Sequence, residues 1–330
     1  MPDTVVAGLD VGGTKTLAVA VDAATDAVVA TVRRPTGAGG EGLQRSTVEI
    51  LAELAAAAGL PVDGFAAVGV GVPGLVDRDA GTVRHAVNLG LGDDPVGLAS
   101  HLGALADAPV VVDNDVNMAA VGAAVALGCR GDLAYLSVGT GLAAGLLLGG
   151  RIRRGAHGAA GEIGHLPVDP DGPPCECGQR GCLEALASGA AIAARWPSGD
   201  GEVAATASLL AAAEADDPAA VAVLSDVARH LAGAVALLAQ TVDPEVVVLG
   251  GGVAEAGPGL LSSVREALRR RGAHSPVLAA IDLADRVALV PEGVPAGALG
   301  AAVQARRLLE RNGESSPAPA PAPARAADGP

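Results

Sequence analysis

Apolar and polar positions follow two different periods along this chain, and together they predict an α/β fold. Short apolar runs that end at glycine, proline or aspartate predict buried strands at 5–11, 17–21, 28–33, 66–72, 109–113, 245–249, 277–281 and 287–290. Apolar residues spaced by three and four predict helices at 42–58, 114–127, most of 183–241 and 296–309. The segments 73–95 and 197–201 follow neither period, and the Pro/Ala-rich tail 314–330 is expected to be disordered.

The nearly apolar run 133–150 has the length of a membrane helix. Its five glycines, at 139, 141, 145, 149 and 150, predict instead two buried strands joined by a turn. The N-terminus has no basic region and no cleavage site, so secretion is not expected. Because reduced thiols are typical of the cytosol, we expect a cytoplasmic protein with no membrane partner.

The composition narrows the possible functions. Half of the 330 residues are apolar, yet Phe, Tyr and Trp occur once each, so small aliphatic residues must fill the core. This length allows two domains. The formal net charge of −15 and the lack of a basic patch argue against nucleic-acid binding. The arginine runs 151–154 and 269–271 are interpreted as solvated faces.

Four residues in a short stretch have the chemistry of a zinc site. Three thiolates and one imidazole suit tetrahedral zinc, and the chain offers His165, Cys175, Cys177 and Cys182. The alternative is a local disulfide with one thiol left over, but Cys-x-Cys is too short for a comfortable disulfide. The predicted metal loop, 165–182, has a glutamate on each side, Glu162 and Glu184.

A glycine turn follows the first predicted strand and has features of a phosphate site. Its backbone N–H groups could approach phosphate oxygens closely, because glycine has no Cβ. Asp10 at the strand end could hold Mg²⁺ through water. The alternative is an ordinary hairpin turn, and the spacing is not that of a Walker A loop. The turn consists of Gly12, Gly13, Thr14 and Lys15.

Two further glycine turns extend this pattern. The segment 135–148 repeats the strand, turn and strand of 8–21, which is consistent with two domains that each contribute a hairpin to one cleft. The second turn consists of Gly139, Thr140 and Gly141. The third turn consists of Gly250, Gly251 and Gly252. It follows the predicted strand 245–249, and we interpret it as a nucleotide contact.

Polar residues at 113–117 follow a predicted strand and begin a predicted helix. This is where α/β folds place ligands. The alternative role is helix capping, which Asn and Asp perform routinely. A cap needs one residue, and Asp113 or Asn114 can supply it, so we predict a catalytic role for Asp115.

Taken as a set, these motifs resemble those of the ROK family of sugar kinases and regulators, within the actin-like, hexokinase and heat-shock ATPase superfamily. The matching segments are 10–15, 71–74, 114–117, 139–141, 158–165, 175–184 and 250–252. The resemblance implies a two-domain actin-like ATPase (ribonuclease H-like) fold with a central cleft for ATP and sugar. The implied domains are 1–113 with the closing helix 296–311, and 114–295.

The resemblance also implies roles for individual residues. Asp115 would be the general base, the three glycine turns would hold ATP·Mg²⁺, and zinc would be structural. His165 would bind zinc with one ring nitrogen and face the sugar with the other. The residues implied to bind sugar are Gly74, Asn88, Asn114, Asp115, Glu162, His165 and Glu184.

The implied activity is ATP-dependent phosphorylation of a hexose, with glucose as the first expectation and a homodimer as the expected assembly. Kinases of N-acetylglucosamine, N-acetylmannosamine, mannose, fructose or allose remain open, as does a non-catalytic sugar-binding protein or regulator. Because regulators of this family carry a DNA-binding segment ahead of the first glycine turn and nine residues precede Asp10 here, a kinase is favoured. The sequence departs from the family pattern at Asp113, where Glu is common, and at Ala143 and Ala144, where glycines are common.

Overall fold

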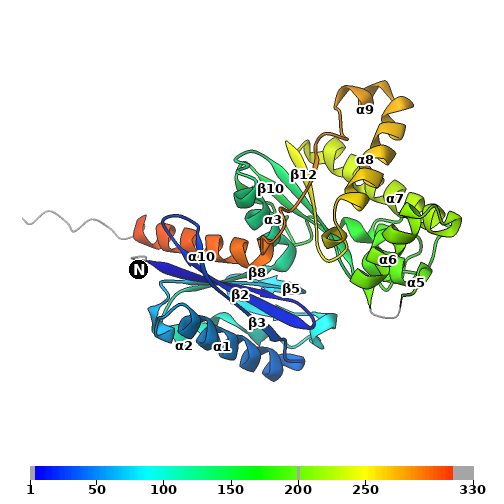
Figure 1. The fold of residues 1–330 in the computed structure, drawn as a ribbon. Helices are drawn as coiled ribbons and strands as arrows, with labels where there is room; N and C mark the ends of the chain where they lie inside the picture. The colour runs from blue at the N-terminus through cyan, green and yellow to red at the C-terminus, as the bar shows by residue number, and fades with distance from the viewer. Residues whose placement is uncertain (1–3, 199–200, 315–330) are drawn as a thin grey trace, which may run out of the picture.

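The chain forms two lobes, each built on a five-stranded sheet (Figure 1). A computed structural model describes residues 4–198 and 201–314. The first sheet has the order β3-β2-β1-β4-β8 and the second the order β11-β10-β9-β12-β13. The first sheet's strands are β1 (Val5–Val11), β2 (Lys15–Asp22), β3 (Val28–Pro35), β4 (Val68–Val72) and β8 (Val110–Asn114). Those of the second are β9 (Leu133–Val138), β10 (Leu142–Leu148), β11 (Arg151–Ile152), β12 (Val246–Gly250) and β13 (Val287–Leu289).

The two sheets share one topology. Strand β1 pairs antiparallel with β2 and parallel with β4, and β9 pairs antiparallel with β10 and parallel with β12. The repeated segments 8–21 and 135–148 therefore form equivalent hairpins, and the run 133–150 forms two strands and a turn as predicted. Both central strands are almost fully buried, which fits the unbroken apolar runs from which they were predicted.

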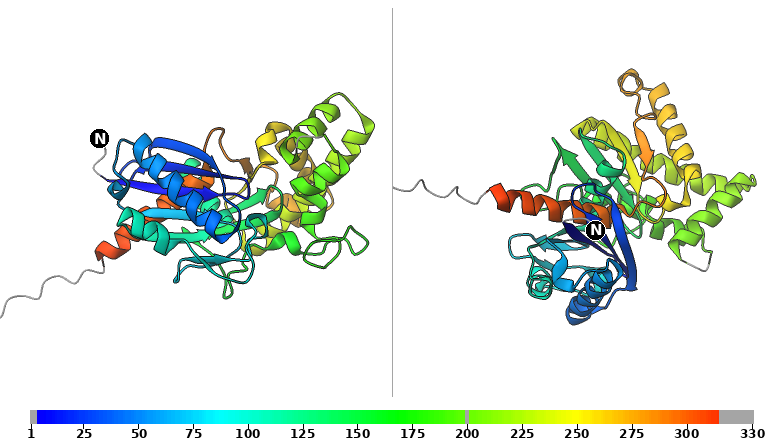
Figure 2. Two further views of the ribbon diagram at one scale, coloured as in Figure 1. Left: turned by 90° about the horizontal axis from the view of Figure 1, so that it is seen from below. Right: turned by 60° about the vertical axis from the view of Figure 1, so that its left-hand side comes forward.

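Helices cover the outer faces of the sheets and fill the space between them (Figures 1 and 2). In the first lobe α1 (Gly39–Ala57) and α2 (Ala99–Ala106) lie on one face. Between the sheets, α3 (Asp115–Ala126) packs against α10 (Ala296–Glu314), and α10 also contacts β1 and β4. The second lobe carries α4 (Leu183–Ala187), α5 (Gly189–Arg195), α6 (Glu202–Glu214), α7 (Pro218–Val242), α8 (Pro258–Ala273) and α9 (Pro276–Ala280).

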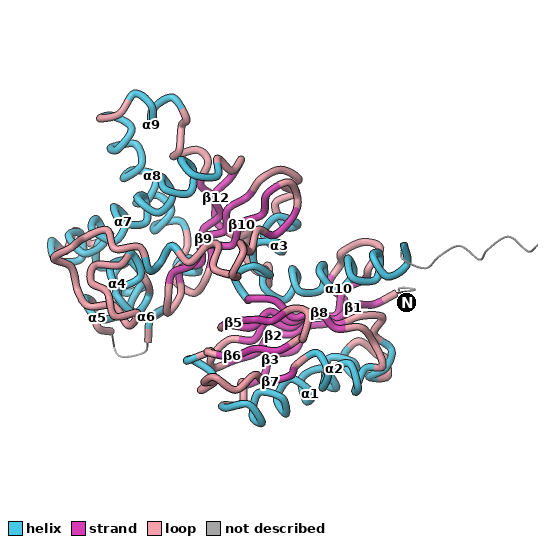
Figure 3. Tube along the Cα trace, turned by 180° about the vertical axis from the view of Figure 1, so that it is seen from behind, coloured by secondary structure: helices cyan, strands magenta, loops and turns pink. Residues whose placement is uncertain are grey.

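Glycines allow α3 and α10 to cross closely. A Cβ on Gly122 would lie 1.9 Å from the carbonyl oxygen of Ala296, and one on Gly300 would lie 1.8 Å from that of Met118. The last helix of the chain is therefore packed against the strand-following helix that begins at Asp115. This crossing places α10 between the two sheets (Figure 3).

Two expectations about local structure were wrong. Residues 277–281 were predicted as a strand, but 277–280 belong to α9 and Ile281 is its C-cap. Pro276 begins the helix, and the Ser275 hydroxyl accepts a hydrogen bond from the Leu278 amide at 3.4 Å. The segment 73–95 contains a small sheet rather than only loop. Its strand β6 (Thr82–Arg84) pairs antiparallel with β5 (Leu75–Asp77) on one side and with β7 (Val96–Gly97) on the other. Residues 199–200 of the predicted interruption and 315–330 of the tail lie outside the described residues.

Among the described residues, α7 alone is long and apolar enough to cross a bilayer by length and composition. Half of its most apolar window is buried inside the fold. Its residues Val227, Leu231, Val235 and Leu238 belong to the hydrophobic core of the second lobe. Their burial accounts for the apolar composition of the helix.

Candidate active site

The predicted catalytic aspartate lies where β8 ends and α3 begins. Asn114 is the N-cap of α3, and its Oδ1 accepts hydrogen bonds from the amides of Val116 at 3.0 Å and Asn117 at 3.4 Å. The cap predicted as an alternative is therefore supplied by Asn114, and its side-chain NH₂ group stays available for a ligand. Asp115 follows as the first helical residue, and its Oδ1 accepts a hydrogen bond from the Val116 amide at 3.0 Å.

Burial changes the acidity of Asp115. Desolvation raises the pKa of this carboxyl to about 6, the Val116 amide opposes the shift, and the charge of Glu162 adds to it. A carboxylate with this pKa is mostly ionised at neutral pH, yet it is far more basic than an exposed aspartate. This combination suits a general base.

Asp113, just before this junction, is buried and has two arginine partners. Arg154 donates to its Oδ2 through Nε at 2.8 Å and also through Nη2, and Arg78 Nε lies 3.2 Å from the same oxygen. Its Oδ1 accepts hydrogen bonds from the Asn114 amide at 2.8 Å and from Asn117 Nδ2 at 3.1 Å. The interpretation of run 151–154 as a solvated face was therefore wrong for Arg154, which compensates a buried charge.

Asp10 lies at the end of β1, next to the first glycine turn. Burial and the charge of Asp115 raise the pKa of Asp10 to about 7, and Lys15 opposes this shift. The Asp10 carboxyl also lies against Gly297 at the start of α10, where a Cβ would come within 2.4 Å of it. The structure thus brings Asp10 and Asp115 within electrostatic range of each other.

The first turn has the properties required to contact phosphate. Gly13 and Thr14 are exposed, and their amides make no hydrogen bond within the described part of the chain. Asn88, a predicted sugar ligand, lies against this turn, since a Cβ on Gly13 would be 3.0 Å from the Asn88 Cβ. Gly74 begins the small sheet with φ of +104°, and a side chain there would lie 2.7 Å from the Arg84 carbonyl oxygen.

Two glutamates contact the second turn. Oε2 of Glu184, on α4, accepts a hydrogen bond from the Leu142 amide at 2.9 Å, and a Cβ on Gly141 would lie 2.5 Å from the same oxygen. The Thr140 hydroxyl donates to Glu202 Oε2 at 2.9 Å. Glu184, predicted only as a sugar ligand, therefore also supports the phosphate turn. No hydrogen bond joins the first and second turns among the described residues.

The loop that carries Glu162 and His165 packs tightly on β10. The Gly161 carbonyl accepts a hydrogen bond from the Ala144 amide at 2.8 Å, and Gly161 has φ of +99°. A Cβ on Gly164 would lie 1.8 Å from the Leu142 carbonyl oxygen. The methyl group of Ala144, a position where glycine is common in the family, packs in the hydrophobic core of the second lobe.

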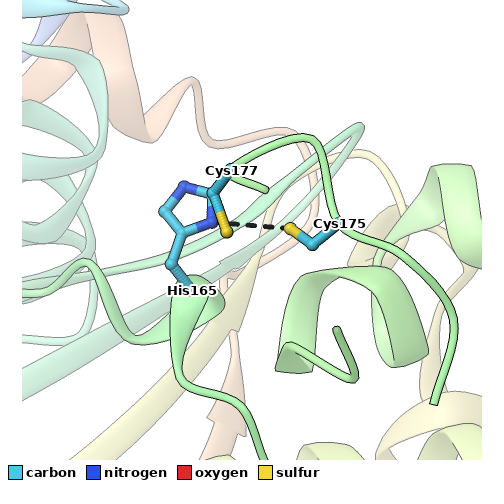
Figure 4. A group of neighbouring side chains, drawn as sticks. All are labelled: His165, Cys175 and Cys177. Atoms are coloured by element: carbon cyan, nitrogen blue, oxygen red, sulfur yellow. Dashed lines mark hydrogen bonds between the residues drawn. The ribbon is translucent and has the colours of Figure 1, made fainter. Parts of the chain in front are cut away.

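The four predicted zinc ligands converge. His165 Nδ1 lies 3.8 Å from Cys175 Sγ, and Cys177 Sγ lies 3.7 Å from Cys182 Sγ (Figure 4 shows the first three side chains). Two sulfurs at 2.3 Å from one tetrahedral zinc are about 3.8 Å apart, and a sulfur and an imidazole nitrogen are about 3.6 Å apart. All four cysteines are free, which excludes the local disulfide. His165, Cys175 and Cys177 present ligand atoms within 4.8 Å of one another, a spacing that fits zinc. Cys182 stands outside this group and lies beside Cys177.

The third turn contacts the central strand of the second sheet. Gly251 has φ of +84°, and a Cβ on Gly250 would overlap the Tyr135 ring, 2.1 Å from its hydroxyl oxygen. Burial raises the pKa of Tyr135, with added repulsion from Asp10, while a hydrogen bond with the Gly251 backbone opposes the shift. The only tyrosine of the chain therefore lies against the third turn, within electrostatic range of Asp10 and Asp115.

Sequence reasoning missed Arg78, Arg154, Tyr135 and Glu202. Arg154 stands within the run 151–154, but nothing in the run distinguishes a paired arginine from a solvated one. The other three are single polar residues whose partners lie far along the chain, so no local pattern reveals them.

Comparison with known proteins accounts for this arrangement. Residues 6–307 match the model of the ROK family. A glucokinase of Streptomyces coelicolor is 33% identical over 282 residues, which cover 80% of this chain and 86% of that protein. A glucokinase of Halalkalibacterium halodurans is 37% identical over 217 residues, or 60% of this chain and 65% of that protein, so the match spans less than two thirds of its length.

Solved structures agree in fold. A ROK hexokinase from Thermus thermophilus aligns with a TM-score of 0.76 and 34% identity, over 93% of this chain and 100% of that one. A ROK glucokinase from Streptomyces griseus, in complex with glucose and AMPPNP, aligns with a TM-score of 0.72 and 32% identity, over 92% and 99%. The chain has the actin-like ATPase fold of these enzymes, as the resemblance implied.

Other relatives have different names. A bifunctional enzyme NanE/NanK of Brucella melitensis is 36% identical over 282 residues, 84% of this chain and 50% of that protein. A xylose repressor of Caldicellulosiruptor bescii is 33% identical over 225 residues, 63% of this chain and 55% of that protein. The glucokinase relatives support a sugar kinase function and leave the sugar open. By its family match, its relatives and its fold, this chain belongs to the ROK family.

Proposed function

We propose that this protein transfers a phosphoryl group from ATP to a hydroxyl of a hexose, with glucose converted to glucose 6-phosphate. The observation that carries the proposal is the environment of Asp115. Its carboxylate lies at the carboxyl end of β8, has a pKa of about 6 and faces the charge of Glu162. The two glucokinase relatives support glucose as the acceptor.

Asp115 would accept the proton of the attacking hydroxyl as the phosphoryl group transfers. Positioning supplies much of the rate in such reactions, so the surrounding hydroxyl ligands must hold the sugar firmly. Asn114 offers its free NH₂ group, and Glu162 lies in the loop that docks on β10. Further sugar contacts are assigned to Gly74, Asn88, His165 and Glu184.

The glycine turns would bind the nucleotide. The unpaired amides of Gly13 and Thr14 would contact phosphate oxygens, with the positive charge of Lys15 beside them. The second and third turns, at 139–141 and 250–252, would complete the nucleotide site. Bound Mg²⁺, held near Asp10, would neutralise phosphate charge.

Zinc would have a structural role here, because four protein ligands leave no open position for water. It would fix the loop from His165 to Cys182, and Cys182 is the N-cap of α4, the helix that carries Glu184. Since Nδ1 of His165 faces Cys175, its Nε2 would be free to contact the sugar.

We also propose domain boundaries from this architecture. The first domain would comprise 1–113 with 296–311, since α10 packs on β1 and β4. The second would comprise 114–295. The two would close over ATP and sugar, which would exclude water from the reaction.

The test is a coupled assay of ADP release with ATP·Mg²⁺ against glucose, N-acetylglucosamine, N-acetylmannosamine, mannose, fructose and allose. Zinc content is measured in parallel, before and after treatment with a chelator. We expect turnover with glucose, about one zinc per chain, and loss of turnover after zinc removal. Sugar binding by folded, zinc-loaded protein without any turnover would refute a kinase and favour a non-catalytic sugar-binding protein.

A further inference from the structure

The Asp113 carboxylate joins three segments that are far apart along the chain. Its side chain is only 3% exposed, so its charge must be compensated inside the protein. Its Oδ1 accepts hydrogen bonds from the Asn114 amide and from Asn117 Nδ2, at the start of α3. The other oxygen faces both Arg78 and Arg154.

Each arginine lies in a segment of the chain close to a candidate sugar ligand. Arg78 follows β5, in the small sheet that begins beside Gly74, and β5 contacts β8 (Figure 3). Arg154 follows β11 in the second sheet, and its carbonyl oxygen accepts a hydrogen bond from the Ala160 amide at 3.0 Å. Ala160 is two residues before Glu162. The ion pairs therefore connect the first sheet, the small sheet and the second sheet around Asp115.

Both arginines rely on the same carboxylate, that of Asp113, as their partner of opposite charge. Two guanidinium groups share one carboxylate, and burial, together with the charge of Arg154, lowers the pKa of Arg78. The Arg78 Nε is buried and makes no hydrogen bond, although it lies 3.2 Å from Asp113 Oδ2. Because the distance is already short, a small rotation of the Arg78 guanidinium group would complete this bond.

We propose that Arg78, Asp113 and Arg154 form a three-way ionic junction that aligns the sugar with Asp115. The three are positioning residues, because they act through Asn114, Gly74 and the Glu162 loop. This inference rests on the proposed sugar kinase function. It adds to that function three residues that do not contact the sugar but determine how precisely the sugar is positioned.

The test compares Arg78→Gln with Arg151→Gln. Arg151 lies on β11 near Arg154 but is exposed and makes no side-chain contact with Asp113, so its substitution is the matched control. We expect Arg78→Gln to lower kcat/KM for the sugar by about 10²-fold, the scale expected for misplaced reactants. KM for ATP should stay at its wild-type value. Arg78→Lys, which keeps the charge but lacks Nε, should lose less.

A double-mutant cycle distinguishes the junction from a general effect on stability. In an Asp113→Asn background, Arg78→Gln should cause little further loss, since its partner is already absent. Additive losses would overturn the junction, and so would a wild-type kcat/KM in Arg78→Gln. If Arg78→Gln does not fold, the same comparisons are made with Arg78→Lys. A wild-type protein that phosphorylates no sugar would refute the proposed function itself, whereas normal wild-type turnover with unaffected variants would refute the junction alone.

Discussion

At the scale of single residues, two carboxylates at strand ends have raised pKa values for the same reason. Asp10 lies at the end of β1 and Asp115 follows β8, and burial makes ionisation of each less favourable. The charge of Asp115 raises the pKa of Asp10 further. The resulting basicity of Asp115 suits a proton acceptor, and it comes from the fold rather than from the residue type.

Removing the charge of Asp115 tests its role directly. We expect Asp115→Asn to lower kcat by roughly 10²–10⁴, the usual effect of losing a general base. Steady-state assays of ADP release measure the change. Asp107→Asn, at an exposed left-handed position at the end of α2, is the control. A near-normal kcat in Asp115→Asn would refute the assignment.

The pKa of Asp115 also predicts a pH dependence. A general base acts only when ionised, so kcat/KM for the sugar should be constant above about pH 7 and fall as the pH drops through about 6. Initial rates between pH 5 and 8, at sugar concentrations well below KM, measure the profile. An unchanged kcat/KM at pH 5 would mean that another group accepts the proton.

At the scale of elements, one strand supports most of the candidate site. The backbone of β10 bonds to Gly161 through Ala144 and to Glu184 through Leu142. The sugar loop and the second phosphate turn are therefore attached to the same strand. This attachment requires glycine at 164, because the backbone of β10 leaves no room for a side chain.

Gly164→Ala should separate this loop from β10. The added methyl group would lie 1.8 Å from the Leu142 carbonyl oxygen, so the loop must shift. We expect a loss of about 1–3 kcal/mol in the free energy of unfolding, and a higher KM for sugar. Denaturant unfolding and sugar titrations measure both. The control is Gly92→Ala, where nothing lies within 4 Å of the new methyl group, so both values should stay unchanged. If Gly164→Ala also left both values unchanged, the loop would not depend on its close contact with β10.

At the scale of the whole molecule, elements distant in sequence meet between the two sheets. Helix α10 returns from the end of the chain, crosses α3 and places Gly297 against Asp10. The environment that raises the pKa of Asp10 is therefore assembled from both ends of the described chain. Folding must confine this carboxyl, and global stability should depend on its protonation.

The sign of that dependence follows from the raised pKa. Between about pH 4 and 7 the folded protein keeps a proton on Asp10 that the unfolded chain releases, so the free energy of unfolding should fall as the pH rises through this window. Asp10→Asn should flatten this fall and raise stability at pH 8 by roughly 1–3 kcal/mol. Thermal and denaturant unfolding without ATP and Mg²⁺ measure it. The exposed control Asp94→Asn should behave as wild type, and an Asp10→Asn variant that behaves likewise would show that Asp10 ionises normally.

Features that depend on neighbouring residues could be predicted from the sequence. The strands on both sides of the first two glycine turns, the grouping of His165 with Cys175 and Cys177, and the helix after β8 were all predicted, because spacing and residue type decide them locally. Tertiary structure alone decided that Arg154 compensates Asp113, 41 positions away, and that Glu184 supports Leu142, 42 positions away. It also provides the burial that raises the pKa values of Asp10 and Asp115. These outcomes depend on which segments meet in space, and a periodic pattern along the chain does not contain that information.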